Sequence, residues 1–367
     1  MWKTTWRVVL IGSLLLLPEG ALLRPQDKNT HPDKPQPARA APEQSGASPQ
    51  QSEALARIRI DSNLVILRVT VKDARGNLVP DMLREEFRIF DDGIEQKTAV
   101  FTAEAFPLSL VILIDNDLKA KDTTMMGNSL RAAAGGVSSS DEAFVCRFDQ
   151  FFYPGPGFIL NGDELMAELK RARIDTRPSE AGPVPFVTGP SWHTRGVGEP
   201  TVAAPTHAGG KATKTLDDAI FASAEILHDR GTGRRKVILV ITDGANGEKF
   251  NHHSYDDVRQ ALLRDNISVY SVAIGNSLLK SKYARLTRYA DDSGGDVYFA
   301  SRSRTMERFY SQITEQARHE YTLAYVPAGN DRRSSYHKIE VLVDRPGLTV
   351  RTRQGYYTGP PTPAVKP

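Results

Sequence analysis

The stretch "LSLVILIDNDLKAK", Leu108 to Lys121, decides how the rest of the chain is interpreted. Its first half is a near-continuous apolar run, typical of a strand that is covered on both faces of a parallel sheet. The run ends at Asp115, and Asn116, Asp117 and Lys119 follow. In open parallel sheets, ligands bind outside the carboxyl ends of the strands. The stretch therefore predicts a fold class and a candidate site together.

Beyond Leu108 the apolar pattern alternates between strand-like and helix-like segments. Such alternation favours a doubly wound, mostly parallel α/β sheet of the Rossmann-like class. The expected strands are 108–115, 142–149, 236–244, 267–275 and 296–300, and the expected helices are 122–137, 162–173, 216–229, 254–266, 281–294 and 304–320.

Strand-like segments without intervening helices lie on both sides of this region. Before it come 64–79 and 87–104, where Asp92-Gly93 is expected to form a hairpin turn. After it come 321–327, 336–345 and 348–358. The economical fold is an α/β domain inserted into a small β-sandwich that is built from N- and C-terminal strands.

The N-terminus is typical of an export signal. Lys3 and Arg7 precede the apolar run Val8–Leu17, which is short for a membrane span. The segment is either cleaved or retained as an anchor, and an uncleaved segment is the one membrane contact that we expect. The protein is therefore expected to be periplasmic, secreted or associated with the cell envelope.

The expected organisation has six parts. Residues 24–55 are rich in Pro, Gln, Ala and Ser and indicate a disordered linker. The stretch 175–212 is too long for an ordinary connection, and is either a functional loop or disordered. The parts are the signal or anchor 1–23, the linker 24–55, sandwich strands in 56–106, the α/β domain 107–319, sandwich strands in 320–358 and the tail 359–367.

Composition and motifs exclude several classes of function. The net charge is +3, with no basic stripe, so nucleic acid is not an expected partner. Cys146 is the single cysteine, so no intrachain disulfide forms, and its apolar surroundings indicate a buried small residue. We find no nucleophile elbow, phosphate-binding loop, H-E-x-x-H or Cys-x-x-Cys motif. An enzyme is therefore not expected.

A second acidic residue stands at the end of a predicted strand. Asp243 follows "VILVIT", and Gly244 allows a sharp turn directly after it. Two carboxylates at neighbouring strand ends suit a hard divalent cation, because such ions prefer oxygen ligands. The pair His252-His253 lies just beyond. We do not expect it to bind metal, but it could contact a partner.

From about 108 to 319 the chain resembles a von Willebrand factor type A domain. With the strands on either side, residues 60–358 resemble a group of exported bacterial von Willebrand factor A-related proteins. The resemblance implies adhesion or complex assembly. It also implies a metal-ion-dependent adhesion site, with the pattern Asp-x-Ser-x-Ser, a later Thr, and an Asp after a central strand.

This chain matches that pattern only in part. Asp115 and Asp243 fit the first and last acids. Asp117 stands where the first Ser is expected and Lys119 where the second is expected. Alignment of the following helix puts Lys214 at the Thr position.

The threonines on either side of that lysine leave a choice open. A shift of one residue would place the hydroxyl of Thr213 or Thr215 in the site instead.

Two hypotheses follow for this site, besides the plain one that the acids only cap helices or face solvent. In the first, which we favour, Lys119 and Lys214 replace the metal in a degenerate site closed by salt bridges. An ammonium group can donate three hydrogen bonds to the carboxylates. In the second, Asp115, Asp117 and Asp243 bind Mg²⁺ or Ca²⁺. No other cofactor is expected.

The sequence thus favours an exported, non-catalytic protein-binding module with an unidentified protein partner. The expected binding face comprises Asp115, Asp117, Lys119, Thr213, Lys214, Thr215 and Asp243. The alternatives are a structural envelope scaffold that has lost its ligand site, and a metal-binding adhesion domain.

Overall fold

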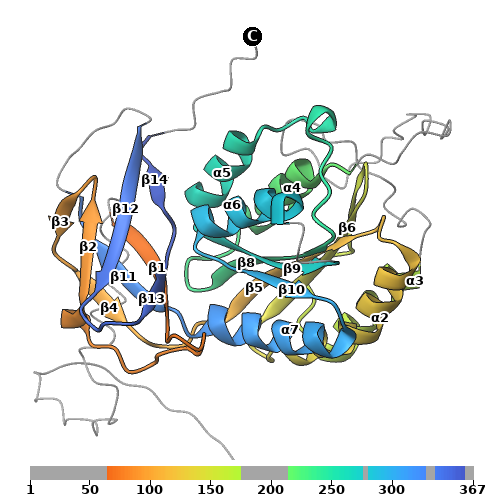
Figure 1. The fold of residues 1–367 in the computed structure, drawn as a ribbon, viewed down its shortest axis with the longest axis horizontal. Coiled ribbons are helices and arrows are strands. Elements are labelled where there is room, and N and C mark those ends of the chain that lie inside the picture. Colours follow the sequence, from red (N-terminus) through yellow and green to blue (C-terminus); the bar gives the residue numbers. More distant parts are fainter. Residues whose placement is uncertain (1–63, 175–213, 276–279, 328–334, 360–367) are drawn as a thin grey trace, which may run out of the picture. The chain divides into compact units, whose positions relative to one another are not determined.

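The structure is a computed structural model that describes residues 64–174, 214–275, 280–327 and 335–359 (Figure 1). The predicted signal segment and linker, the stretch 175–212 and most of the tail lie outside the described residues. Among the described residues, no helix combines the length and apolar character needed to cross a membrane.

A six-stranded sheet forms the centre of the α/β part, in the order β10-β9-β8-β5-β6-β7. Strands β5, β6, β8, β9 and β10 run parallel, and β7 pairs antiparallel with β6 at the edge. The predicted mostly parallel sheet is confirmed. The strands are β5 (Leu108–Asp115), β6 (Glu142–Phe148), β7 (Phe152–Pro154), β8 (Arg235–Thr242), β9 (Ile267–Ile274) and β10 (Val297–Ala300).

Helices cover both faces of this sheet (Figure 1). One face packs against α2 (Ala120–Gly135), α3 (Gly162–Ile174) and α7 (Ser303–Arg318). The other packs against α4 (Leu216–His228), α5 (Tyr255–Arg264) and α6 (Ala284–Ser293). Short 3₁₀ turns lie at Arg84–Glu86, Glu248–Phe250 and Lys280–Tyr283.

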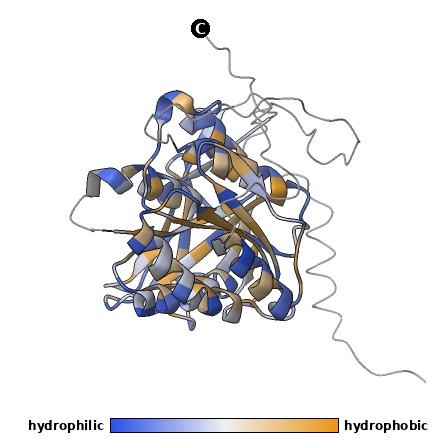
Figure 2. Cartoon of the chain, turned by 90° about the vertical axis from the view of Figure 1, so that its right-hand side faces the viewer, coloured by the Kyte–Doolittle hydropathy of each residue, from blue (hydrophilic) through white to orange (hydrophobic). Residues whose placement is uncertain are grey.

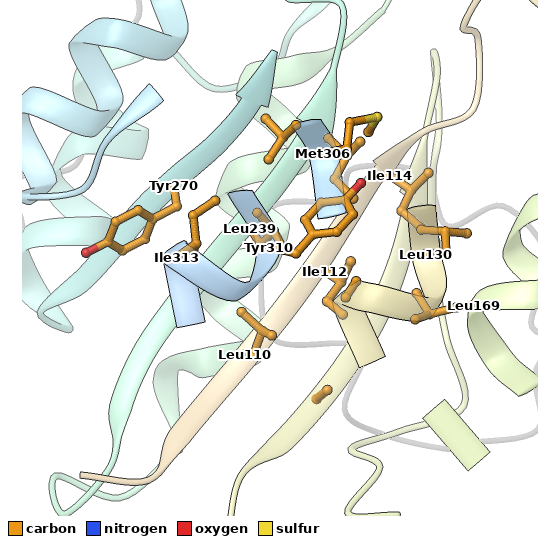
Figure 3. Close-up of a cluster of buried hydrophobic side chains, with 14 of the residues drawn as sticks. Leu110, Ile112, Ile114, Leu130, Leu169, Leu239, Tyr270, Met306, Tyr310 and Ile313 are labelled. Carbon is orange, nitrogen blue, oxygen red and sulfur yellow. The ribbon is translucent and has the colours of Figure 1, made fainter. Parts of the chain in front are cut away.

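Strand β5 holds the two layers of the core together, because all of its residues are buried. Ile112 and Ile114 pack against the face with α2 and α7, and Val111 and Leu113 pack against the opposite face. Figure 3 shows Ile112 and Ile114 beside Tyr310 of α7, and in Figure 2 the central strands carry the hydrophobic colour. Full burial of each such side chain stabilises the fold by about 1.5–3 kcal/mol. The continuous apolar run thus corresponds to a strand covered on both sides.

The remaining strands form two antiparallel sheets around a third apolar cluster. Each sheet combines strands from before and after the α/β part, which confirms the predicted β-sandwich. One sheet has the order β13 (Thr349–Arg351), β1 (Val65–Lys72), β11 (Tyr321–Tyr325), β4 (Val100–Thr102), and the other β14 (Gly355–Tyr357), β12 (Tyr336–Val343), β2 (Phe87–Asp91), β3 (Ile94–Gln96).

The hairpin between β2 and β3 turns at Asp92-Gly93, as predicted. Asp91 pairs with Ile94, which leaves a two-residue turn. The φ angles are +48° at Asp92 and +80° at Gly93. Positive φ at both turn residues is the requirement of a type I′ turn, whose twist matches that of the strands.

Ion pairs join the sandwich strands to the α/β part. Lys72 in β1 donates to Asp296 at 2.7 Å, and Arg351 in β13 donates to Asp291 at 2.7 Å. The buried guanidinium of Arg353 donates to the backbone oxygen of Leu263 at the end of α5. The sandwich therefore contacts α5, α6 and the residue that precedes β10.

Candidate functional site

The candidate site lies where the connections of the sheet change direction. The chain proceeds from β5 outward to β6 and β7, then returns to β8 and continues outward to β9 and β10 on the other side. In sheets of this order, ligands bind at the carboxyl ends of the two strands where the direction changes. Asp115 is the last residue of β5, and Asp243 directly follows β8.

Lys214 lies between these two carboxylates. Its ammonium donates to Asp115 Oδ2 at 2.8 Å and to Asp243 Oδ1 at 3.0 Å. The lysine precedes α4 by two positions and is 5% exposed, and Asp115 is 1% exposed. One buried ammonium group therefore connects the ends of β5 and β8.

The other positions around the two carboxylates are also occupied by donors. Asp115 accepts from the Thr242 hydroxyl at 2.7 Å and from the Asp117 backbone amide at 3.0 Å. Asp243 accepts from the Ala245 backbone amide at 3.0 Å. Its second oxygen accepts from the Lys282 ammonium at 2.9 Å. All four carboxylate oxygens thus have a donor within the protein.

The charges in this cluster balance. Asp115 and Asp243 contribute two negative charges, and Lys214 and Lys282 contribute two positive charges, so the sum is zero. Because every neighbour of Asp115 donates, its hydrogen bonds require the ionised carboxylate.

The pKa shifts in the cluster have opposing causes. Burial raises the pKa of Asp115, and the charge of Lys214 opposes this. Burial lowers the pKa of Lys214, but the charges of Asp115 and Asp243 outweigh it, and the pKa is raised. Burial also opposes ionisation of Asp243, yet the Ala245 amide and the lysines lower its pKa. Lys214 is thus held in the charged form.

These residues do not fit a divalent cation. The ion would have to approach the carboxylates that already hold the Lys214 ammonium. At roughly 4 Å and an effective dielectric constant near 20, a divalent ion and an ammonium repel by about 8 kcal/mol. The lysine is buried in this position, so its displacement would also break both of its ion pairs.

The structure places the other predicted site residues differently. Asp117 and Lys119 are exposed, and neither side chain pairs with any described residue. Lys119 is the residue that precedes the first turn of α2. Thr215 precedes α4 and donates its hydroxyl to the backbone oxygen of Asp149. Thr213 lies outside the described residues.

Three residues near the site were not identified from the sequence. Asp149 follows β6 and accepts from the side chain of Asn116 at 3.3 Å. It stands at a strand end, so the signal that marked Asp115 was available for it as well. Thr242 precedes Asp243 and could have been examined with it. Lys282 had no such signal, because it belongs to a segment that follows β9.

The histidine pair at the neighbouring loop shares one buried carboxylate. Asp218 accepts from the backbone amides of His252 and His253, and both rings place Nδ1 within 3.2 Å of it. His253 also stacks on Phe221, with a centroid distance of 3.7 Å. Ser254 then caps α5 through the Asp257 amide. These contacts fix the loop after Asp243 against α4.

A comparison with protein-family models agrees with the fold. A family model of the von Willebrand factor type A domain matches residues 202–312. A comparison with curated proteins finds no match.

Among solved structures, the chain is similar to BatB from Bacteroides thetaiotaomicron at 12% identity and a TM-score of 0.40, covering 57% of this chain and 98% of that one. It is similar to a von Willebrand factor type A protein from Catenulispora acidiphila at 11% identity and a TM-score of 0.41, covering 82% of this chain and 75% of that one. It is similar to proximal thread matrix protein 1 from the mussel byssus, with a zinc-occupied MIDAS motif, at 14% identity and a TM-score of 0.39, covering 62% of this chain and 49% of that one.

The matched segment contains the helix α4 that follows Lys214, β8 with Asp243 directly after it, and the parallel strands β9 and β10, whereas β5 with Asp115 and β6 lie before it. Domains of this type are generally non-catalytic modules that bind other proteins. With the strand order and the family match in agreement, the chain carries a von Willebrand factor type A domain.

Proposed function

We propose that this protein is an exported, non-catalytic binding module that recognises another protein without a metal ion. The observation that carries the proposal is the position of Lys214, whose ammonium joins the carboxylates of Asp115 and Asp243. In the resemblance that the sequence suggests, a metal would occupy this position. Here the lysine supplies the positive charge, so the adhesion site is degenerate and closed by salt bridges.

The binding face comprises the loops at this end of the sheet. The loop after Asp243 is joined to the site, because the Gly247 amide donates to the Lys214 backbone oxygen at 2.7 Å. This loop presents Phe250, which is 56% exposed. Exposed aromatic side chains are frequent anchors in protein interfaces. On the other side of the site, Lys119 is exposed.

The proposed partner therefore carries an acidic group next to an apolar one. Lys119 has no carboxylate partner among the described residues and remains available to an acidic side chain. Phe250 would enter an apolar recess of the partner. Charge of this kind mainly raises the association rate and the specificity, while the aromatic contact contributes the affinity.

Export also belongs to the proposal. Lys3 and Arg7 before the apolar run Val8–Leu17 support a signal segment or anchor.

The test is capture of the partner from envelope extracts by the full chain. We expect capture in EDTA as well as in Mg²⁺, and loss of capture by the double variant Lys119→Glu, Phe250→Ser. Lys97→Glu is the matched control, because Lys97 is an exposed lysine of the sandwich between β3 and β4.

Two outcomes would contradict the proposal. Capture that requires Mg²⁺ would indicate a metal-dependent adhesion domain that uses Asp115, Asp117 and Asp243. Capture that the double variant leaves unchanged would favour a structural scaffold whose ligand site is lost.

A further inference from the structure

A second cluster of polar side chains lies in the β-sandwich, at the hairpin between β2 and β3. Asp91 ends β2, Asp92 is the first residue of the turn, and His337 lies on the neighbouring strand β12. The Asp92 amide donates to the Lys338 backbone oxygen at 2.9 Å, which fixes the turn against β12. The two acids and the histidine therefore meet at one end of a sheet.

Asp91 is buried, and only one of its two carboxylate oxygens is hydrogen-bonded within the part of the chain that the structure describes. The residue is 7% exposed. Its Oδ2 accepts from the hydroxyls of Tyr325 at 2.8 Å and Tyr356 at 2.9 Å. Its Oδ1 has no hydrogen-bond partner among the described residues, and lies 3.8 Å from His337 Nδ1. Buried polar atoms in folded proteins are normally paired, so this oxygen is open to a further ligand.

The other two side chains are held in position around this oxygen. His337 Nδ1 lies 2.8 Å from Asp92 Oδ2. Asp92 Oδ1 accepts from the Lys338 amide at 2.8 Å, so its second oxygen is directed to the histidine. The ring of His337 stacks on Tyr356 with a centroid distance of 5.0 Å and an interplanar angle of 19°. One atom of each of the three side chains lies within 4.8 Å of the others.

We propose that Asp91 Oδ1, Asp92 Oδ2 and His337 Nδ1 bind a divalent transition-metal ion, with Zn²⁺ as the best match. Two carboxylates and a neutral imidazole carry two negative charges, which a divalent ion neutralises. An imidazole ligand favours zinc and its neighbours over magnesium or calcium, which prefer oxygen ligands only. The proposal does not rest on the proposed function.

The contacts around the three ligands are those that a metal site requires. Ligating carboxylates and histidines are usually held by further hydrogen bonds. Tyr325 and Tyr356 hold Asp91, and Ser335 Oγ lies 3.1 Å from His337 Nε2. The Asp92 side chain is 51% exposed, so an ion can enter from solvent and keep a water as its fourth ligand.

Two of the three separations between ligand atoms are close to those of a tetrahedral zinc site. Zinc–nitrogen and zinc–oxygen distances near 2.0 Å imply ligand separations of about 3.3 Å in a tetrahedral site. Asp92 Oδ2 would move away from His337 Nδ1 by roughly 0.5 Å, and Asp91 Oδ1 would approach by a similar amount. His337 would bind the ion in the neutral tautomer that carries its proton on Nε2, the nitrogen that lies 3.1 Å from Ser335 Oγ.

The test is calorimetric titration of the full chain with ZnCl₂. We expect one ion to bind at this cluster in the wild type. His337→Gln should weaken that binding at least 100-fold. Tyr356→Phe, which removes only a donor to Asp91, should weaken it about 10–100-fold. His319→Gln is the matched control, because His319 is an exposed histidine paired with Glu315 on α7, and should bind as the wild type does.

Near-UV circular dichroism establishes that each variant is folded. Equal affinity of the wild type and His337→Gln would overturn the proposal, as would the absence of zinc binding to the wild type. Asp91→Asn provides a second reading: it keeps the size of the side chain, so loss of zinc binding in a folded Asp91→Asn protein would support the site.

Discussion

Replacement of Lys214 by threonine should turn this site into one that needs a metal. The substitution removes the buried ammonium and leaves Asp115 and Asp243 without their shared partner. Loss of one member of a buried ion pair costs about 3–5 kcal/mol. For a domain of this size, 1 kcal/mol shifts the melting temperature by about 2–4 °C, so we expect the variant to melt roughly 6–20 °C lower in EDTA.

Magnesium should then restore much of this loss. The variant offers the carboxylates of Asp115, Asp117 and Asp243 together with a threonine hydroxyl, which are oxygen ligands of the type that Mg²⁺ prefers. At 100 times its dissociation constant, an ion that binds only the folded state stabilises it by about 2.7 kcal/mol. The expected gain is therefore about 5–11 °C. The wild type should not respond, because Lys214 already neutralises the site.

The assay is a thermal melt of the wild type, Lys214→Thr, and Lys214→Thr combined with Asp243→Asn, each in EDTA and in millimolar Mg²⁺. All of these proteins also carry His337→Gln, so that an ion bound at the cluster of Asp91, Asp92 and His337 does not contribute to the response. The double variant should lose the response to Mg²⁺. The reasoning would be refuted if the wild type gained stability from Mg²⁺, or if Lys214→Thr melted like the wild type in EDTA.

Three further predictions follow from the contacts of single residues. Lys282→Met should cost no more than about 1 kcal/mol in chemical denaturation, because its pair with Asp243 is partly exposed; a cost equal to that of Lys214→Thr would contradict this. Asp141→Asn should cost about 1–3 kcal/mol at neutral pH, because Asp141 accepts from Arg318 and from two backbone amides. Burial opposes ionisation of Asp141, but these donors lower its pKa, so its contribution is present above the unfolded pKa. The difference from wild type should shrink as the pH falls below about 4, and a difference that is independent of pH would refute the argument. Burial raises the pKa of the Cys146 thiol, so mass spectrometry should find no alkylation of Cys146 before the protein is unfolded.

The fold could be predicted because apolar periodicity is a local property of the sequence. The run that ends at Asp115 is apolar at every position, and only a strand covered on both faces buries it completely. The turn at Asp92-Gly93 was also readable, since few residue pairs accept positive φ at both positions. The mixing of N- and C-terminal strands in the sandwich followed from strand-like segments on both sides of the α/β region.

For the site, the order of residues was enough to show which strand ends carry acids and which nearby positions carry lysines. Which of those lysines contacts the carboxylates depends on the tertiary structure. Lys214 is buried between Asp115 and Asp243, whereas Lys119 faces solvent, and Lys282 reaches Asp243 from a segment after β9.

The same holds for the second cluster, where His337 stands far from Asp91 in the chain and no spacing connects them. Salt bridges and ligand clusters depend on distances of a few ångströms between residues remote in sequence, and the packing of β-strands and helices sets those distances.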